Sequence, residues 1–140
     1  MKHQIATTPE QSKRLLACGL NYKTADMTLS FCNDSFYELM ATPFHYGCFT
    51  EKDAPAWSLS ALLALLPTSL TSAMGNKYML ELSKLRMHNA WEVQWFNGRE
   101  RWRTVDKDKK YHKLWDESPI EACVRAIEYL TANGYTLNTK

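Results

Sequence analysis

Few residues in this sequence have the types and spacing that support chemistry, and the clearest pair is His45 and Cys48. Both side chains ligate zinc, but a tetrahedral site needs four ligands. The remaining candidates stand at no spacing typical of such a site: Cys32, His88 and His112. A cysteine near a histidine can also act as a thiolate nucleophile, which requires a fixed geometry and an oxyanion-binding site that nothing in the sequence indicates. Walker, GxGxxG, HExxH and GxSxG motifs are also absent. We therefore predict no metal, no cofactor and no catalytic residue, and expect a protein that is not an enzyme.

The four cysteines, at positions 18, 32, 48 and 123, form no CxxC pair. They also lack the short spacings that staple a small secreted fold, so we expect reduced thiols. Cys123 falls on the apolar side of a predicted helix, where we interpret it as a packing residue. Three acidic residues near the start of that helix are explained by the electrostatics of a helix N-terminus: Asp116, Glu117 and Glu121.

A basic stretch between residues 99 and 113 suggests a different chemistry, the binding of an anion. It carries seven Lys or Arg residues against three Asp or Glu, whereas the whole chain has a formal net charge of only +2. Such a cluster can neutralise phosphates, but basic runs between structural elements are more often solvated loops. Nucleic-acid binding through this edge is our alternative hypothesis, with the following contact residues: Arg99, Arg101, Arg103, Lys107, Lys109, Lys110 and Lys113.

The element that positions the first of these arginines is a predicted β-hairpin. Asn97-Gly98 indicates a two-residue type I′ turn, which places Phe96 opposite Arg99. The strands cover about residues 91–96 and 99–104, and side chains alternate between the two faces along each strand. One face then carries Trp91, Val93, Trp95 and Trp102. The other carries Glu92, Gln94, Phe96, Arg99, Arg101 and Arg103.

This separation of tryptophans from arginines bears on the two hypotheses. A surface that stacks bases needs aromatic rings and cations on the same side. We expect instead that the tryptophan face packs beneath a helix and that the arginine face meets water. Gln94 and Phe96, on the polar side, are our candidate contact patch.

Capping signals and hydrophobic periodicity predict three helices, at about residues 9–18, 59–66 and 119–133. A further strand is expected at about 78–87 with a bulge near Ser83-Lys84, and a short one at Thr28–Cys32. Residues 33–57 look irregular because they contain Pro43, Gly47 and Pro55. We therefore predict one α+β domain spanning residues 1–140, in which an antiparallel sheet centred on the hairpin carries helices mainly on one face.

The composition is typical of a globular protein, with 45% hydrophobic and 23% charged residues. The most apolar run, from Leu59 to Leu66, is far shorter than the roughly 20 residues of a membrane span. The first residues are polar and do not look like a secretory signal. These features predict a cytoplasmic protein without membrane contact.

Short motifs along nearly the whole chain resemble small proteins of unassigned activity from prophages and conjugative elements of gut bacteria. They are Thr8-Pro-Glu-Gln-Ser-Lys-Arg-Leu-Leu16, Gly19-Leu20, Thr24-Ala-Asp-Met27, Pro55-Ala-Trp-Ser-Leu59, Leu65-Leu-Pro67, Ser118-Pro-Ile-Glu-Ala122 and Asn133-Gly-Tyr135. The resemblance implies a mobile-element context and an intracellular location, and it assigns no site residues. We expect an accessory protein that acts through contacts with a protein partner, which includes a second copy of itself.

The predicted order of elements from Leu59 to Asn133, helix, three strands and helix, also resembles the double-stranded-RNA-binding module. This chain departs from that module at the last helix, which begins with Ser118-Pro-Ile-Glu-Ala122 instead of a lysine-rich turn.

Overall fold

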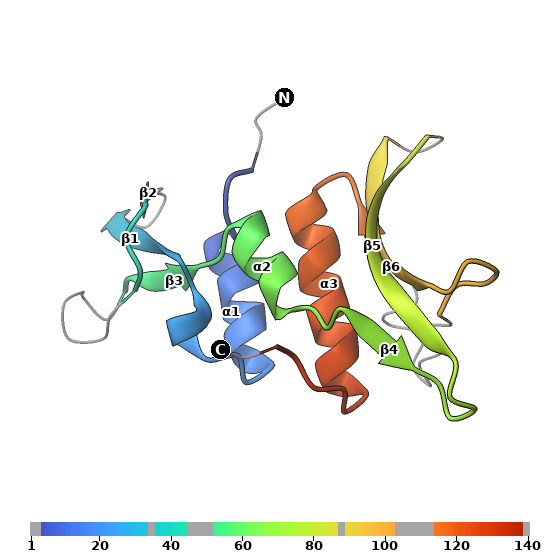
Figure 1. The fold of residues 1–140 in the computed structure, drawn as a ribbon. Coiled ribbons are helices and arrows are strands. Elements are labelled where there is room, and N and C mark those ends of the chain that lie inside the picture. The colour runs from blue at the N-terminus through green and yellow to red at the C-terminus, as the bar shows by residue number, and fades with distance from the viewer. Residues whose placement is uncertain (1–3, 34–35, 45–51, 87–88, 103–113, 139–140) are drawn as a thin grey trace.

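Helix α3 (Pro119–Ala132) lies at the centre of the fold, with helices on one side and a sheet on the other (Figure 1). Ser118 caps it, since its Oγ accepts a hydrogen bond from the Glu121 N–H at 3.3 Å. Eight of its fourteen residues are buried, as expected for a helix packed on two sides. The structure, a computed structural model, describes residues 4–33, 36–44, 52–86, 89–102 and 114–138.

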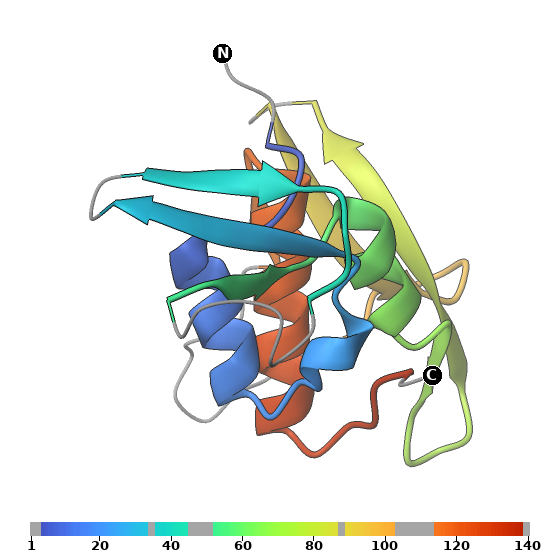
Figure 2. The ribbon, with the colours of Figure 1, turned by 90° about the vertical axis from the view of Figure 1, so that its left-hand side faces the viewer.

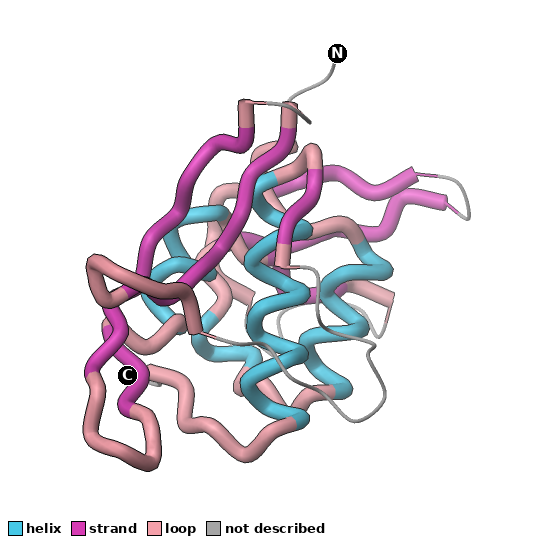
Figure 3. The backbone as a smooth tube through the Cα atoms, turned by 90° about the vertical axis from the view of Figure 1, so that its right-hand side faces the viewer, coloured by secondary structure: helices cyan, strands magenta, loops and turns pink. Residues whose placement is uncertain are grey.

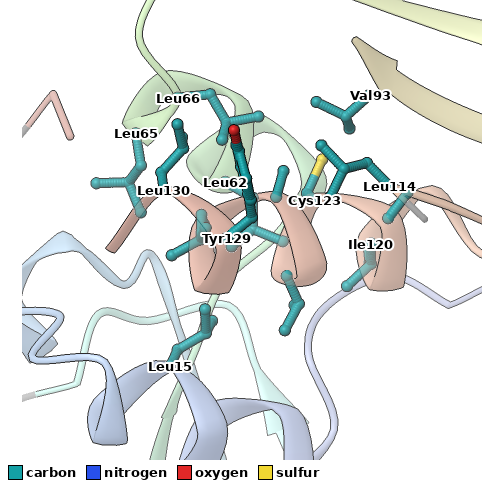
Figure 4. Packing of buried hydrophobic residues seen from close by; sticks show 14 of the residues in the cluster. Leu15, Leu62, Leu65, Leu66, Val93, Leu114, Ile120, Cys123, Tyr129 and Leu130 are labelled. Carbon is teal, nitrogen blue, oxygen red and sulfur yellow. The ribbon is translucent and has the colours of Figure 1, made fainter. Parts of the chain in front are cut away.

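Helices α1 (Pro9–Ala17) and α2 (Leu59–Leu65) pack on the side of α3 that faces away from the sheet (Figures 1 and 4). Thr8 and Gln11 form the predicted capping box of α1, and Ser58 caps α2. All three predicted helices are confirmed, with ends within one residue of the prediction. Within the described ranges, no helix combines the length and apolar character needed to cross a membrane.

A network of ion pairs joins α1 to α3. Arg14 contacts both Glu121, at 2.7 Å, and Glu128, while Arg125 contacts Glu121 at 2.9 Å and Asp116 at 3.3 Å. Burial alone would raise the pKa of Glu121, but hydrogen bonds from Arg14 and Gln11 and the charges of Arg14 and Arg125 outweigh it and lower that pKa. Glu121 therefore serves as a shared anchor between two helices, which is more than the helix-terminus role expected from its position.

The larger sheet covers the other side of α3. It contains β4 (Ser69–Thr71), β5 (Lys77–Leu85), β6 (Ala90–Phe96) and β7 (Trp115–Asp116), in the order β4-β5-β6-β7 and antiparallel throughout. The helices lie on one face of this sheet, and the other face is turned away from them (Figures 1 and 3). The predicted α+β class is thus confirmed, although the described residues between α2 and α3 form four strands where three were predicted.

The predicted hairpin register is wrong by two residues. Phe96 pairs with Arg101, not Arg99, and a four-residue loop replaces the two-residue turn. The cause is the Asn97 side chain, whose Oδ1 accepts hydrogen bonds from the N–H groups of Arg99 and Glu100, each at 2.8 Å. Because side chains alternate with a period of two, this shift leaves Arg101 and Trp102 on their predicted faces. Residues 99–102 of the predicted return strand are described: Arg99 and Glu100 lie in the loop, and Arg101 forms a single bridge with Phe96 rather than a strand.

The predicted bulge in β5 is also wrong. The pairing of β5 with β6 runs without a shift from Met79 opposite Phe96 to Leu85 opposite Ala90. In the sequence, the apolar residues change from even positions (Leu80 and Leu82) to odd ones (Leu85 and Met87). This change is explained by the end of the part of β5 that faces the core. Leu80 and Leu82 face the core, whereas Lys84 occupies the next position on that face.

A second, smaller sheet was not foreseen in full. It contains β1 (Met27–Asn33), β2 (Phe36–Met40) and β3 (Ala54–Ala56), in the order β2-β1-β3, and a short 3-10 helix η1 (Tyr22–Thr24) precedes it. The strand expected at Thr28–Cys32 is confirmed as the centre of β1. The expectation that 33–57 is irregular is wrong for β2 and β3. This sheet lies beyond α1 and α2, on the side of the molecule opposite the larger sheet (Figures 1 and 2).

Candidate functional site

An apolar groove lies between the segment that precedes α1 and the β1–β2 hairpin. Its volume is about 520 Å³. The described residues that line it are Ile5, Ala6, Thr7, Thr8, Pro9, Leu29, Phe36, Tyr37 and Leu39. We call this feature the β2 groove. Two other hollows formed by the described residues are smaller, with volumes of about 220 and 170 Å³.

Backbone contacts hold the N-terminal wall of the β2 groove against the small sheet. Ala6 bridges to Ser58, and the Thr7 N–H donates to the Trp57 carbonyl at 2.9 Å. The Thr7 hydroxyl also accepts a hydrogen bond from the Trp57 N–H at 3.0 Å. Because residues 6 and 7 are fixed in this way, the wall exists before any ligand arrives, which lowers the entropic cost of binding.

The opposite wall is the apolar face of the β1–β2 hairpin. Phe31 and Tyr37 lie opposite each other in the two strands, and their rings meet edge to face at 5.4 Å. The Phe31 N–H donates to Asp53 Oδ1 at 2.7 Å, and the Lys52 ammonium lies 4.7 Å from the centre of the Phe31 ring. These contacts give the hairpin a defined shape where it projects from the helices (Figure 2).

The hairpin and the segment that precedes α1 nevertheless leave much apolar surface uncovered. Ile5 is 67% exposed, Phe36 54% and Met40 37%, and Tyr37 and Leu39 are only half-buried. In the described sheet, β2 is an edge strand whose one neighbour is β1. Glu38, exposed at the middle of β2, is the only charged residue in these two strands. An open edge beside apolar pockets is a geometry to which extended peptides add as an extra strand.

The predicted basic edge is only partly described. Arg99 is exposed in the loop after β6, and the Arg101 Nη1 atom lies 3.0 Å from Glu92 Oε1 across the strands. The other five predicted contact residues lie outside the described residues: Arg103, Lys107, Lys109, Lys110 and Lys113. The structure therefore brings Arg99 and Arg101 to one end of the larger sheet, where Arg101 is paired with an acid.

The predicted contact patch lies on the outer face of the larger sheet. The Gln94 side chain donates to Glu81 Oε2 at 3.0 Å. Phe96 is half-buried beside Met79, its partner in β5, which is 45% exposed. Gln94 and Phe96 thus share one face of the sheet, where Gln94 makes a polar contact and Phe96 forms an apolar pair with Met79.

The predicted tryptophan face holds for three of its four residues. Val93 and Trp95 are buried in the main core, and Trp102 packs against it while its indole N–H donates to the Tyr129 hydroxyl at 3.1 Å. Trp91 differs, because it lies half-buried outside this core, with the Lys84 ammonium 5.8 Å from its ring centre.

The residues considered for metal or thiolate chemistry lie mostly outside the described part of the chain, namely His45, Cys48, His88 and His112. Among the residues that are described, no three metal-ligating side chains converge. Cys18, Cys32 and Cys123 are free thiols. Cys123 is fully buried beneath the sheet, as predicted from its position on α3, and burial raises its pKa to about 12.

The comparisons with known proteins add no candidate function. No protein-family model, no curated protein and no solved structure matches the chain. The β2 groove, which sequence reasoning missed, therefore has to be interpreted from its own geometry. The one local signal for its edge strand was the content of aromatic and aliphatic residues in Phe36-Tyr-Glu-Leu-Met40.

Proposed function

We propose that this protein is a non-enzymatic binding protein that holds an extended segment of a different protein along β2. The observation that carries the proposal is the open edge of β2 beside the β2 groove. A bound strand would complete the hydrogen bonding of this edge, and its alternate side chains would enter the groove. The mobile-element context and the intracellular location implied by the sequence motifs remain predictions alongside it.

The composition of the edge supports binding rather than avoidance of contact. Edge strands are commonly protected by lysine, proline or a bulge that prevents pairing with another chain. β2 contains neither lysine nor proline, and its register with β1 is regular from Met40 to Tyr37, with an irregularity only at its first residue. Its exposed Phe36 and Met40 flank a single acid, Glu38.

The charge of Glu38 defines the chemistry of the partner. Antiparallel self-pairing centred on this residue would place two carboxylates opposite each other, which is destabilising. A lysine or arginine at that position in the added strand forms a favourable cross-strand pair instead. The proposed partner is therefore an extended segment of another protein in which apolar side chains alternate and one basic residue faces Glu38.

A peptide-display selection tests this proposal without a known partner. The purified protein is used to enrich random linear nonapeptides, and the expected consensus is a run of alternating apolar residues with a central Lys or Arg. The Glu38→Lys variant is expected to enrich acidic residues at the same central position, because the cross-strand charge is reversed. The matched control is Glu117→Lys, an exposed acid before α3 that does not line the β2 groove, which should leave the consensus unchanged.

Three results would contradict the proposal. The first is a selection without enrichment, and the second is a basic consensus that Glu38→Lys leaves intact. The third is sedimentation of the purified chain as a dimer that Phe36→Asp converts to monomer, because the occupant of the edge would then be a second copy. Nucleic-acid binding through residues 99–113 remains a prediction, since five of its seven contact residues lie outside the described residues.

A further inference from the structure

A second hollow, of about 170 Å³, lies at the edge of β6 that faces away from β5. The described residues that line it are Glu92, Val93, Gln94, Trp95, Arg101, Trp102 and Leu114. It forms where two segments that pair with β6 separate. The Val93 N–H donates to the Leu114 carbonyl at 2.9 Å, and the Trp102 N–H donates to the Trp95 carbonyl at 2.7 Å. Gln94 stands between these two contacts, so we call this feature the Gln94 hollow.

Two buried acceptors at the Gln94 hollow lack a hydrogen-bond donor in the described structure, Glu92 Oε1 and Gln94 Oε1. The Gln94 amide nitrogen is already used, because it donates to Glu81, and this contact also fixes which end of the amide is the oxygen. Arg101 Nη1 lies within ion-pair distance of Glu92 Oε1, at 3.0 Å, but the two groups are not aligned for a hydrogen bond. Buried acceptors without donors are rare and costly, so a site that holds two of them suits a ligand that donates hydrogen bonds.

The charges at the Gln94 hollow favour a cation. The Glu92 side chain is 15% exposed and that of Arg101 is 60% exposed, so the carboxylate is the buried charge and the guanidinium is its solvated counter-ion. A cationic ligand that takes the place of Arg101 would keep a positive charge beside the Glu92 carboxylate, while the 60% exposed guanidinium can turn to water. An anion would meet the Glu92 carboxylate and the Gln94 amide oxygen instead.

The aromatic wall of the Gln94 hollow is rigid. The Trp102 ring meets Tyr78 and Tyr135 edge to face, at 5.2 and 5.8 Å, and its indole N–H is bound to Tyr129. Trp95, on the same side, is 1% exposed and donates from its indole N–H to the Pro67 carbonyl at 3.0 Å. Trp95 and Trp102 line the hollow from the core face of the sheet, whereas Glu92 and Gln94 line it from the outer face. The ammonium head of a ligand would donate to the two acceptors, while its alkyl chain would extend toward the tryptophans at the edge of β6.

We infer that the Gln94 hollow binds a primary alkylammonium group, through Glu92 and Gln94 as acceptors and the tryptophans as apolar wall. The group is that of a free small amine or of a lysine side chain. Because this site lies on the larger sheet, the inference is independent of the β2 groove. A failure of one does not affect the other.

The test is an NMR titration of the ¹⁵N-labelled full chain with n-butylammonium chloride, with 1-butanol as the neutral control of the same alkyl length. Saturable shifts of the Trp102 indole N–H and the Gln94 side-chain amide are expected with the ammonium salt alone. Glu92→Gln should weaken binding by about 10-fold or more, because it removes a charge-assisted hydrogen bond. Arg101→Gln should strengthen binding, because it removes the competing cation. The control Glu38→Gln, on the other sheet, should change nothing.

The opposite signs of the Glu92 and Arg101 variants keep the test decisive even if one variant folds poorly. Nα-acetyl-lysine amide serves as a second probe because it mimics a lysine side chain within a protein. It should bind if the ligand is a lysine side chain, and it should not bind if the hollow accepts only a free small amine. The inference is overturned if butanol shifts the same signals, if no saturation occurs, or if inorganic phosphate binds instead and loses its affinity in Arg101→Gln.

Discussion

The region around α3 and the β1–β2 hairpin differ in how completely they are covered. Helix α3 is enclosed by two helices and a sheet, and its apolar residues from Ile120 to Leu130 are at most 2% exposed (Figure 4). The hairpin shares a small core with β3 and the N-terminal segment, in which Ala6, Leu29 and Ala56 are buried and Met27, Tyr37, Leu39 and Ala54 are partly buried, whereas Phe36 and Met40 are exposed. Stability is therefore concentrated at α3, whereas the hairpin can present apolar side chains to a partner at little cost to the fold.

The largest expected difference between these regions is in thiol reactivity. Cys32 is exposed on β1, whereas Cys123 is fully buried on α3 with a pKa raised to about 12 by burial. Alkylation of Cys123 needs a thiolate and an opening of the core, so its rate under native conditions should be at least about a thousandfold below that of Cys32. Iodoacetamide labelling followed by mass spectrometry of tryptic peptides measures both rates in one sample. Rapid native labelling of Cys123 would contradict the enclosed core.

The second prediction compares one side chain from each region. Trp95→Ala should lower the free energy of unfolding by about 3–5 kcal/mol, because it leaves a large cavity beside α3. It also removes the donor to the Pro67 carbonyl. Leu39→Ala, in the half-covered hairpin, should cost only about 1 kcal/mol, since little of its surface is removed from water. Urea unfolding followed by circular dichroism measures both. Equal costs would mean that the hairpin is as essential to the fold as α3.

The third prediction concerns the ion pairs that fasten α1 to α3. Glu121→Gln should lower the free energy of unfolding at pH 7 by about 1.5–3 kcal/mol, because Glu121 accepts charge-assisted hydrogen bonds from Arg14. Its pKa in the folded protein is lowered, so its contribution is complete above the unfolded value of about 4.3 and is lost as the pH falls through the folded value. The difference between wild type and variant should therefore shrink below about pH 4.

Urea titrations at pH 7 and at successively lower pH measure this change. Glu117→Gln is the matched control, since Glu117 is exposed just before α3, and it should alter stability by less than about 0.5 kcal/mol at either pH. A Glu121→Gln effect that stays constant into acid would show that the lowered pKa is not the source of the stabilisation.

The region around α3 was the more predictable one, because its signals are local. Thr8 and Ser118 cap helices through bonds to residues three positions along, and such short-range patterns can be recognised in sequence. Even the wrong hairpin register left the tryptophans on the correct face, since an error of two residues preserves the alternation. The sequence did not predict the hydrogen bonds between the Asn97 side chain and the backbone that follows it, and these bonds are what lengthen the loop.

The hairpin region was predicted poorly for the opposite reason. In β2, residues on both faces are apolar or aromatic apart from Glu38, so the alternation that signals a half-buried strand is missing. The β2 groove also joins residues 5–9 to Leu29 of β1 and to Phe36, Tyr37 and Leu39 of β2, and β3 connects the two parts by pairing with β1 beside the Ala6–Ser58 bridge. A site assembled from distant segments has no local signature, whereas the Glu92 and Gln94 acceptors at the other hollow were at least placed on the correct face.

The smallest expected effect on stability is at the N-cap of α3. This cap connects the two regions, because Ser118 also contacts Gln4 in the N-terminal segment. Ser118 Oγ accepts from the Glu121 N–H and donates to Gln4 Oε1 at 2.7 Å. Ser118→Ala removes both bonds and should lower the free energy of unfolding by about 1 kcal/mol, the usual contribution of such a cap. Thr131→Ala, at the far end of α3, is the control, because its hydroxyl only donates to carbonyls within the helix.

Hydrogen exchange at Ala6 and Thr7 should also become faster in Ser118→Ala, but not in Thr131→Ala, if the Gln4 contact helps to hold the wall of the β2 groove. An unchanged rate would show that the groove is held by the bridge to Ser58 and by Thr7 without help from α3.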